Sequence, residues 1–251
     1  MTTIDLPKFP TRHGYLSEKI QRDYIASASA KKLLPVDAYR MPEIVSLTAP
    51  SDVSKPVQFW QLFSVLGQDP IVKIVQSFYE CVFSDEEWFS SVFARVGGIG
   101  HHINTQASMW IDVMGGGPYY HGAEFRLSFH HTHNAIQLMN EKGADRWSQL
   151  MLKTLENSSD LAAADPRIRT SINTFLSFFM AKYSTEFTFE NRSFFGETNP
   201  AFECKIDFMK MTEQAIGDMS EAELSEALTA RGVDVSSYVG KEALVTKALM
   251  M

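Results

Sequence analysis

Apolar side chains recur three and four residues apart along most of the chain, which is the spacing of helices that bury one face. The clearest stripe, within residues 70–83, consists of Ile71, Ile74, Val75, Phe78 and Val82. The same spacing predicts further helices over residues 57–66, 101–114, 144–155 and 166–183. Alternation of apolar and polar residues, which would indicate strands, does not extend over a useful length. The predicted fold class is therefore all-α.

Histidines concentrate in one window of the chain, since six of the seven lie between residues 101 and 133. Within the predicted helix 101–114, one apolar face consists of Ile103, Ala107, Trp110 and Met114. His102 and Gln106 are four residues apart and share a neighbouring polar face. Gly115–Pro118 ends this helix, because glycine tolerates the turn at a helix end and proline cannot continue the hydrogen-bond ladder. A second helical face is predicted to carry Phe125, Phe129, His133, Ile136 and Leu138.

Several motifs in and around this window match one family. The motifs are Met114-Gly115-Gly116-Gly117-Pro118-Tyr119-Tyr120, then Phe129-x-x-x-His133-x-x-Ile136-x-Leu138, then Trp147, with Phe63-x-x-x-Gly67, Phe78-Tyr79 and Phe93 upstream. In this combination, residues from about 60 to 185 resemble the truncated haemoglobins, also called 2-on-2 globins. The resemblance implies an all-α, truncated-globin core that binds haem b, iron protoporphyrin IX.

The resemblance also implies that His133 is the proximal ligand of the haem iron, because it occupies the histidine position of the second motif. His130 and His131 remain competitors for this role. Trp147 follows His133 by fourteen residues, one more than in the family, so a one-residue insertion near Lys142-Gly143 is needed.

On the distal side, the resemblance implies that Tyr79, His102, Gln106 and Trp147 face the gas ligand. Each could donate a hydrogen bond to bound oxygen, and a buried bond of this kind is worth about 1 to 3 kcal/mol. Judged from its helix alone, Tyr79 is an amphipathic residue at the border of the apolar stripe. His102 could also bind the iron directly in the ligand-free protein.

Further side chains are expected to contact the haem. Phe93 looks like the family's phenylalanine that packs on the porphyrin. His130 stands where the family usually has an arginine that pairs with a propionate, so this contact passes to His130, Arg126 or Tyr120. The expected contacts are Phe93, Met109, Trp110, Met114, Tyr120, Arg126, Phe129, His130, Ile136 and Leu138.

A polar pocket of this kind suits tight holding of a gas, or oxygen chemistry, better than rapid transport. We therefore expect reversible binding of O2, NO or CO. Nitric oxide dioxygenation is the enzymatic extension, and it would need an unknown external reductase, because no flavin or nicotinamide pattern is visible in the sequence. The alternative is a haem-based gas or redox sensor or adaptor that signals through its terminal helical modules.

Without the resemblance, the same residues allow other interpretations. One is a haem-free helical bundle with scattered polar residues. Another is a non-haem metal site, but thiolate and clustered carboxylate ligands are absent, and adjacent histidines on a helix diverge. Its ligands would come from His101, His102, His121, His130, His131 and His133. Gly97–Gly100 could cradle a phosphate, but neither a strand before the loop nor a phosphate-binding lysine supports this.

Composition narrows the list of partners. A net charge of −7 over 251 residues disfavours nucleic acid and anionic membranes. No apolar run is long enough to span a bilayer. Cys81 and Cys204 lie far apart, and the start of the chain does not resemble a secretory signal. We therefore expect reduced thiols in the cytoplasm, with an organelle not excluded.

The domain organisation follows from these patterns. We expect an N-terminal extension at 1–55 with a helix from Ser17 toward Leu34, a haem domain at 56–187, a connector and helix at 188–215 and a helical module at 216–251. The module contains Met219-Ser220-x-x-Glu223-Leu224-x-x-Ala227-Leu228 and Gly240-Lys241-x-x-Leu244-Val245, and it resembles the helix-extended-helix SAP module. Some SAP members bind DNA, but six acids against three bases at 216–251 disfavour phosphate contacts. Protein contact or packing is the expected role.

Overall fold

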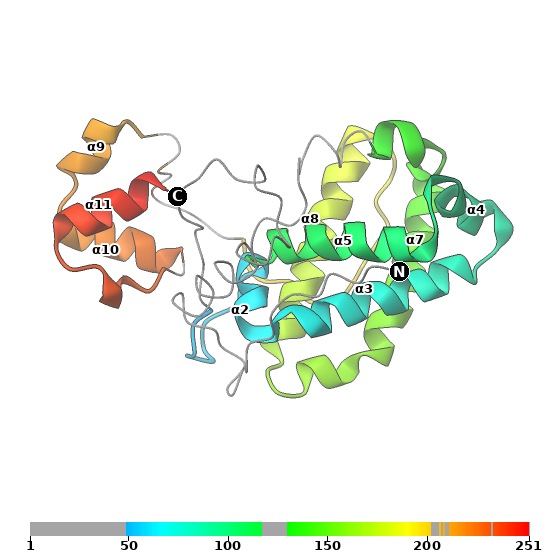
Figure 1. Ribbon diagram of the computed structural model, residues 1–251, viewed down its shortest axis with the longest axis horizontal. Helices are drawn as coiled ribbons and strands as arrows, with labels where there is room; N and C mark the ends of the chain where they lie inside the picture. The colour runs from blue at the N-terminus through cyan, green and yellow to red at the C-terminus, as the bar shows by residue number, and fades with distance from the viewer. Residues whose placement is uncertain are drawn as a thin grey trace.

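The computed structural model of the protein describes residues 49–116, 130–201, 206, 208, 211–231 and 233–250. Within these ranges the regular structure is entirely helical, which confirms the predicted class. Figure 1 shows a larger helical body that includes α3, α5, α7 and α8, and a smaller one made of α9, α10 and α11. No helix in the described ranges is long and apolar enough to cross a membrane. The helix expected from Ser17 toward Leu34 lies outside the described residues.

The larger body begins with helices that the apolar stripes predicted. They are η1 (Phe59–Gln61), α2 (Leu62–Leu66), α3 (Gln68–Phe83), α4 (Glu87–Val96) and α5 (Ile99–Val113). Gly67 turns the chain between α2 and α3 with a φ of 69°, a conformation that glycine adopts at no steric cost. The stripe of α3 is buried, and Ile71 and Val82 are fully inaccessible to solvent.

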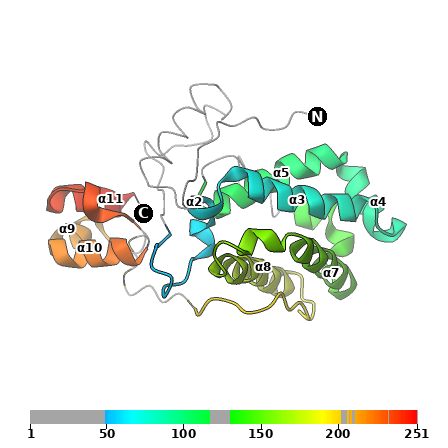
Figure 2. The same ribbon diagram turned by 90° about the horizontal axis from the view of Figure 1, so that it is seen from below.

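A second pair of helices completes this body. It consists of α7 (Glu141–Asn157) and α8 (Arg167–Glu186), joined through η4 (Ser159–Ala162). Figure 2 shows α3 and α5 in one layer and α7 and α8 in the other. The layers meet through aromatic rings, with Trp110 of α5 at 4.8 Å from Phe175 of α8, and Phe78 of α3 at 5.0 Å from Trp147 of α7, measured between ring centroids. This two-over-two arrangement buries one continuous apolar core.

The histidine-rich segment does not form the single helical face that was predicted through residue 138. Its described part consists of a π-helical turn, η2 (His130–Asn134), and a 3-10 turn, η3 (Ile136–Leu138). These windings rotate successive side chains by different angles, so an α-helical period does not apply across them. Consequently Leu138 is buried, whereas Ile136 is 47% exposed.

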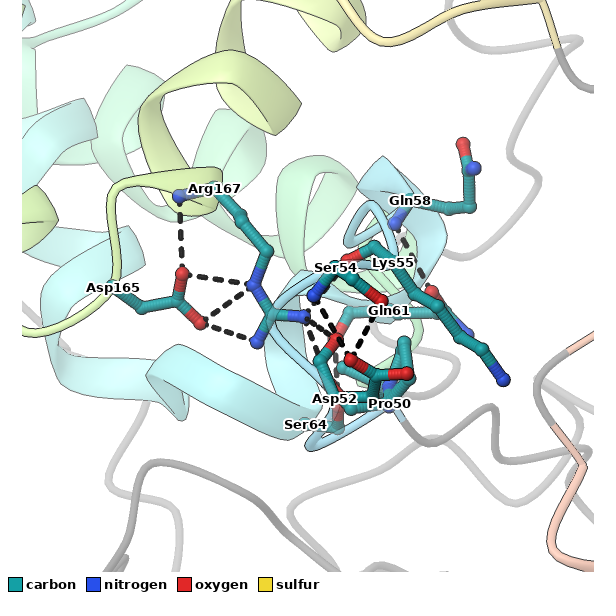
Figure 3. Close-up of polar contacts among 10 residues, drawn as sticks. Pro50, Asp52, Ser54, Lys55, Gln58, Gln61, Ser64, Asp165 and Arg167 are labelled. Carbon is teal, nitrogen blue, oxygen red and sulfur yellow. Dashed lines mark hydrogen bonds and ion pairs between the residues drawn. The ribbon is translucent and has the colours of Figure 1, made fainter.

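Arg167, at the start of α8, fixes the path by which the chain enters the larger body. Its Nη1 donates to the carbonyl oxygens of Pro50, Asp52 and Lys55 at 3.0, 2.9 and 2.8 Å. Its Nε and Nη2 donate to the Asp165 carboxylate at 2.9 and 2.6 Å. In Figure 3 the guanidinium group lies between that carboxylate and the backbone of residues 50–55. One side chain thereby joins segments more than a hundred residues apart.

The smaller body has its own apolar core. Its helices are α9 (Glu213–Asp218), α10 (Glu221–Ala230), η6 (Val235–Ser237) and α11 (Lys241–Leu249). Its buried core residues are Phe208, Ile216, Leu224, Ala227, Leu228, Val233, Leu244 and Ala248. A connector and a helix were expected within residues 188–215, and in the described part helix α9 begins only at Glu213, where the Thr212 hydroxyl accepts a bond from the Ala215 amide at 3.2 Å.

Candidate functional site

A cavity lies within the larger body and is lined by residues of both helix layers. Its polar or partly polar lining consists of Tyr79, Gln106, His130, His131, Trp147 and Tyr183. The remainder is apolar or glycine: Phe89, Phe93, Met109, Trp110, Ala135, Leu138, Met139, Gly143, Ala144, Phe175, Leu176, Phe179, Met180 and Phe189. An apolar and aromatic lining with a few polar groups is typical of cofactor sites.

The structure brings together many, but not all, of the site residues expected from the sequence. Those that line the cavity are Tyr79, Phe93, Gln106, Met109, Trp110, His130, Leu138 and Trp147. Those described but absent from its lining are His102, Met114, His133 and Ile136. Tyr120, Arg126 and Phe129 lie outside the described residues.

Three expected hydrogen-bond donors reach the cavity from three different helices. Tyr79 of α3 is only 5% exposed, and Trp147 of α7 is half-buried against Phe78. Gln106 of α5 is half-buried, with its Nε2 at 3.9 Å from the sulfur of Met109. The cavity lining therefore contains a hydroxyl, a side-chain amide and an indole N–H group.

His102 lies behind this group rather than in the cavity lining. Its Nε2 is 2.9 Å from the carbonyl oxygen of Phe93, and its ring stacks on Tyr79 with centroids 5.2 Å apart. Burial lowers the pKa of His102, the bond to Phe93 opposes this, and repulsion from His101 lowers the pKa further. The His102 ring thus packs against Tyr79 and Phe93 without lining the cavity.

The turn His130–Asn134 contributes two imidazoles to the cavity. His130 and His131 both line it, and the ring of His131 lies 4.3 Å from that of Tyr183 in α8. Burial lowers the pKa of His130, and repulsion from His102 and His101 acts in the same direction. The neutral ring that this favours is the form that binds a metal. His133 is instead exposed, with its Nδ1 at 2.8 Å from the Thr132 hydroxyl.

Several lining residues were not expected as site residues. Phe175, Phe179 and Tyr183 belong to the inward face of α8, so their periodicity predicted burial but not contact with the cavity. Phe189 lies after α8, in a segment whose composition indicated only a connecting loop with aromatic anchors. No sequence pattern distinguishes it from the exposed Phe194.

The alternative of a non-haem metal site finds no support in the described ranges. Among those residues, no three histidine, cysteine, aspartate or glutamate side chains come together as a metal-ion site requires. His121, one of the six histidines considered, lies outside these ranges.

Comparison with known proteins agrees with the arrangement of the helices. Residues 61–181 match the family model described as bacterial-like globin. A relative in Arabidopsis thaliana, "Two-on-two hemoglobin-3", is 29% identical over 101 residues, which are 40% of this chain and 57% of that protein. "Group 2 truncated hemoglobin 3-1" of Lotus japonicus is 31% identical over 101 residues, 40% of this chain and 59% of that protein. The match thus spans less than two thirds of either relative, and no solved structure matches the chain.

Proposed function

We propose that residues 61–181, which match the bacterial-like globin model and are similar to two truncated haemoglobins, form a globin domain that binds one haem b in the cavity and there reversibly binds O2, NO or CO. The observation that carries the proposal is the cavity lining. Aromatic and apolar side chains suit a flat macrocycle, two imidazoles in the lining are candidate metal ligands, and Tyr79, Gln106 and Trp147 carry hydrogen-bond donors. When bound, haem supplies an iron atom at which a diatomic gas binds and electrons are transferred.

The axial ligand is proposed to come from the turn His130–Asn134. The spacing of the family motif assigns the role to His133, whereas the cavity lining contains His130 and His131. All three rings belong to one short turn, so the winding of that turn decides which ring reaches the iron. Within this turn, the ring of His131 contacts that of Tyr183 in α8, which supports His131 as a candidate.

Haemin titrated into the purified full chain tests the proposal. We expect a Soret band that saturates at one haem per chain. Loss of the band only in His133→Ala would support His133 as the axial ligand, as the motif assigns. Loss only in His131→Ala or only in His130→Ala would support that histidine, as the cavity lining indicates. A full chain that stays colourless under all conditions would contradict the proposed function.

Tyr79 is proposed to hold the gas ligand through its hydroxyl. Loss of one buried hydrogen bond of about 1.4 kcal/mol corresponds to a tenfold change in an equilibrium constant. Tyr79→Phe should therefore speed O2 release by about tenfold, measured by stopped-flow displacement. Tyr238→Phe, which removes a hydroxyl from the smaller body, is the control and should not change the rate. An unchanged rate in Tyr79→Phe would remove this hydroxyl from the role.

We extend the proposal to nitric oxide dioxygenation, in which NO and O2 together with one electron give nitrate. The donors from Tyr79, Gln106 and Trp147 support it, because they stabilise negative charge that develops on oxygen. The electron would come from an external reductase. Steady consumption of NO in air with a generic reductase is expected, while a single burst of one equivalent per chain would limit the protein to reversible binding.

A gas or redox sensor or adaptor is the second candidate function. The separate core of the smaller body favours it, since a part that folds around its own residues can contact a partner. Binding of a partner would support this role if it changes when the gas ligand binds and if it requires residues 190–251. Capture that is the same with and without the ligand would contradict it.

A further inference from the structure

The segment of residues 187–201, called the strap here, follows α8 and contains no helix. Figure 2 shows it, in yellow, passing along α7 and α8. Polar contacts hold it on both helices. The hydroxyls of Ser193 and Ser148 of α7 are 2.5 Å apart, and the Asn173 amide of α8 donates to the Glu197 carbonyl at 2.9 Å. The Asn199 backbone amide donates to the Thr174 hydroxyl at 2.8 Å.

The phenylalanines of the strap differ sharply in their surroundings. Phe195 is only 2% exposed and anchors the strap in the core. Phe189 packs against the same core and lines the cavity. Phe194, between a half-buried serine and the buried Phe195, is 77% exposed. The strap has four phenylalanines, Phe187, Phe189, Phe194 and Phe195, and only Phe189 belongs to the cavity lining.

The start of the strap also lies near the histidine turn. Its first residue, Phe187, has its ring 6.4 Å from that of His131, and the chain then turns at Thr188, whose φ is 55°. The Phe189 amide donates to the Ser184 carbonyl at 3.1 Å, which ties the start of the strap to the end of α8. Phe189 therefore completes the cavity from outside residues 61–181, the part that matches the globin family.

We propose that the strap is part of the cofactor site and that Phe189 slows the loss of haem from it. The inference rests on the proposed function. A bound macrocycle would bury the apolar ring of Phe189, and removal of that ring takes away apolar contact that must otherwise be broken before the haem leaves. Hydrogen bonds at Ser193, Glu197 and Asn199 hold the backbone of the strap against α7 and α8, two of the helices that line the cavity.

Transfer of haem from the loaded full chain to an excess of a haem-scavenging apoglobin tests this proposal. Phe189→Ala is expected to lose haem about tenfold faster than the wild type, the ratio expected when roughly 1.4 kcal/mol of contact is lost. Phe194→Ala makes the same chemical change in the same strap and should stay within about twofold of wild type. Equal rates of loss from Phe189→Ala and wild type would overturn the proposal.

Gly196→Ala provides a second variant that leaves Phe189 in place. Gly196 has a φ of 119°, and an added Cβ would lie 2.7 Å from the Asn173 amide nitrogen that holds the strap. We expect faster haem loss here too, with far-UV circular dichroism unchanged, and a wild-type rate would overturn the strap's role. Failure of the wild-type chain to take up haem would overturn the proposed function, whereas uptake with equal loss rates in all variants would overturn only this inference.

Discussion

Arg167 shows how much of the fold can depend on a single side chain. Its guanidinium and the Asp165 carboxylate are each only 11% exposed, and three backbone carbonyls also accept bonds from it. Lysine keeps the charge, but its donors all lie on one nitrogen and cannot reproduce the planar, three-nitrogen array of the guanidinium. Arg167→Lys is therefore expected to lower the free energy of unfolding by about 1 to 3 kcal/mol, measured by urea unfolding.

Arg192 offers the matched control. It pairs with Glu141 and Glu190, but its side chain is 57% exposed, and exposed ion pairs contribute little to stability. Arg192→Lys should therefore leave the urea midpoint close to that of the wild type. Equal losses in the two variants would show that the buried network around Arg167 has no special role.

His102 is expected to make the stability of the haem-free domain depend on pH. Burial lowers its pKa from the ordinary value of 6.5, and burial also lowers the pKa of His130. Below about pH 6.5 His102 is protonated more readily in the unfolded chain than in the folded chain. The free energy of unfolding therefore decreases as the pH falls through this range. Above about pH 6.5 His102 is neutral in both the folded and the unfolded chain, so its titration no longer changes the free energy of unfolding.

His102→Asn should reduce this slope. Urea midpoints of the haem-free protein, compared between about pH 7.5 and pH 5.5, provide the measurement. We expect the wild type to lose more stability over this interval than the variant. The same loss in both proteins would assign the proton uptake to other groups.

At the scale of single elements, helix α7 begins where only glycine fits. The Asn140 side chain accepts a bond from the Gly143 amide at 3.1 Å, and a Cβ added to Gly143 would lie 2.1 Å from the Leu138 carbonyl oxygen. Gly143→Ala must push backbone away from backbone, so we expect it to cost about 2 kcal/mol. Both Gly143 and Leu138 line the cavity, and haemin binding should therefore weaken as well.

Gly217→Ala in α9 tests whether this effect is local. Nothing lies within 4 Å of a Cβ added there, and alanine in a helix is favoured over glycine by about 0.5 to 1 kcal/mol. Haemin titration and urea unfolding should therefore show no loss in Gly217→Ala. A normal haemin affinity in Gly143→Ala would mean that the contact between α7 and η3 does not shape the cavity.

The elements differ in how far the sequence could predict them. Helices α3, α5 and α8 have long apolar stripes with an α-helical period, and their positions were predicted within a few residues. The turn from His130 to Leu138 was not predicted, because its π and 3-10 windings break that period. The contact of Phe189 with the cavity could not be predicted either, since an irregular segment has no regular spacing that shows which way a side chain points.

At the scale of the molecule, the two-over-two core could be predicted because the motifs resemble those of the 2-on-2 globins. Tyr79, Gln106 and Trp147 meet from three helices, and no periodicity within one helix can show this. The resemblance named them, and the structure places all three in the cavity lining. His102 was named by the same route but packs behind Tyr79, because its Nε2 lies against the Phe93 carbonyl. The choice among His130, His131 and His133 stays a prediction.

Two separate apolar cores predict that the chain does not unfold in one step. Leu228 is fully buried in the smaller core and Ile71 in the larger. Replacing such a residue by alanine costs about 2 to 5 kcal/mol. Leu228→Ala should therefore lower the temperature of one transition in far-UV circular dichroism and leave the temperature of Soret loss unchanged, whereas Ile71→Ala should lower the Soret transition. If Leu228→Ala shifts both transitions equally, the two bodies unfold as one cooperative unit, and the division between haem domain and C-terminal module is wrong.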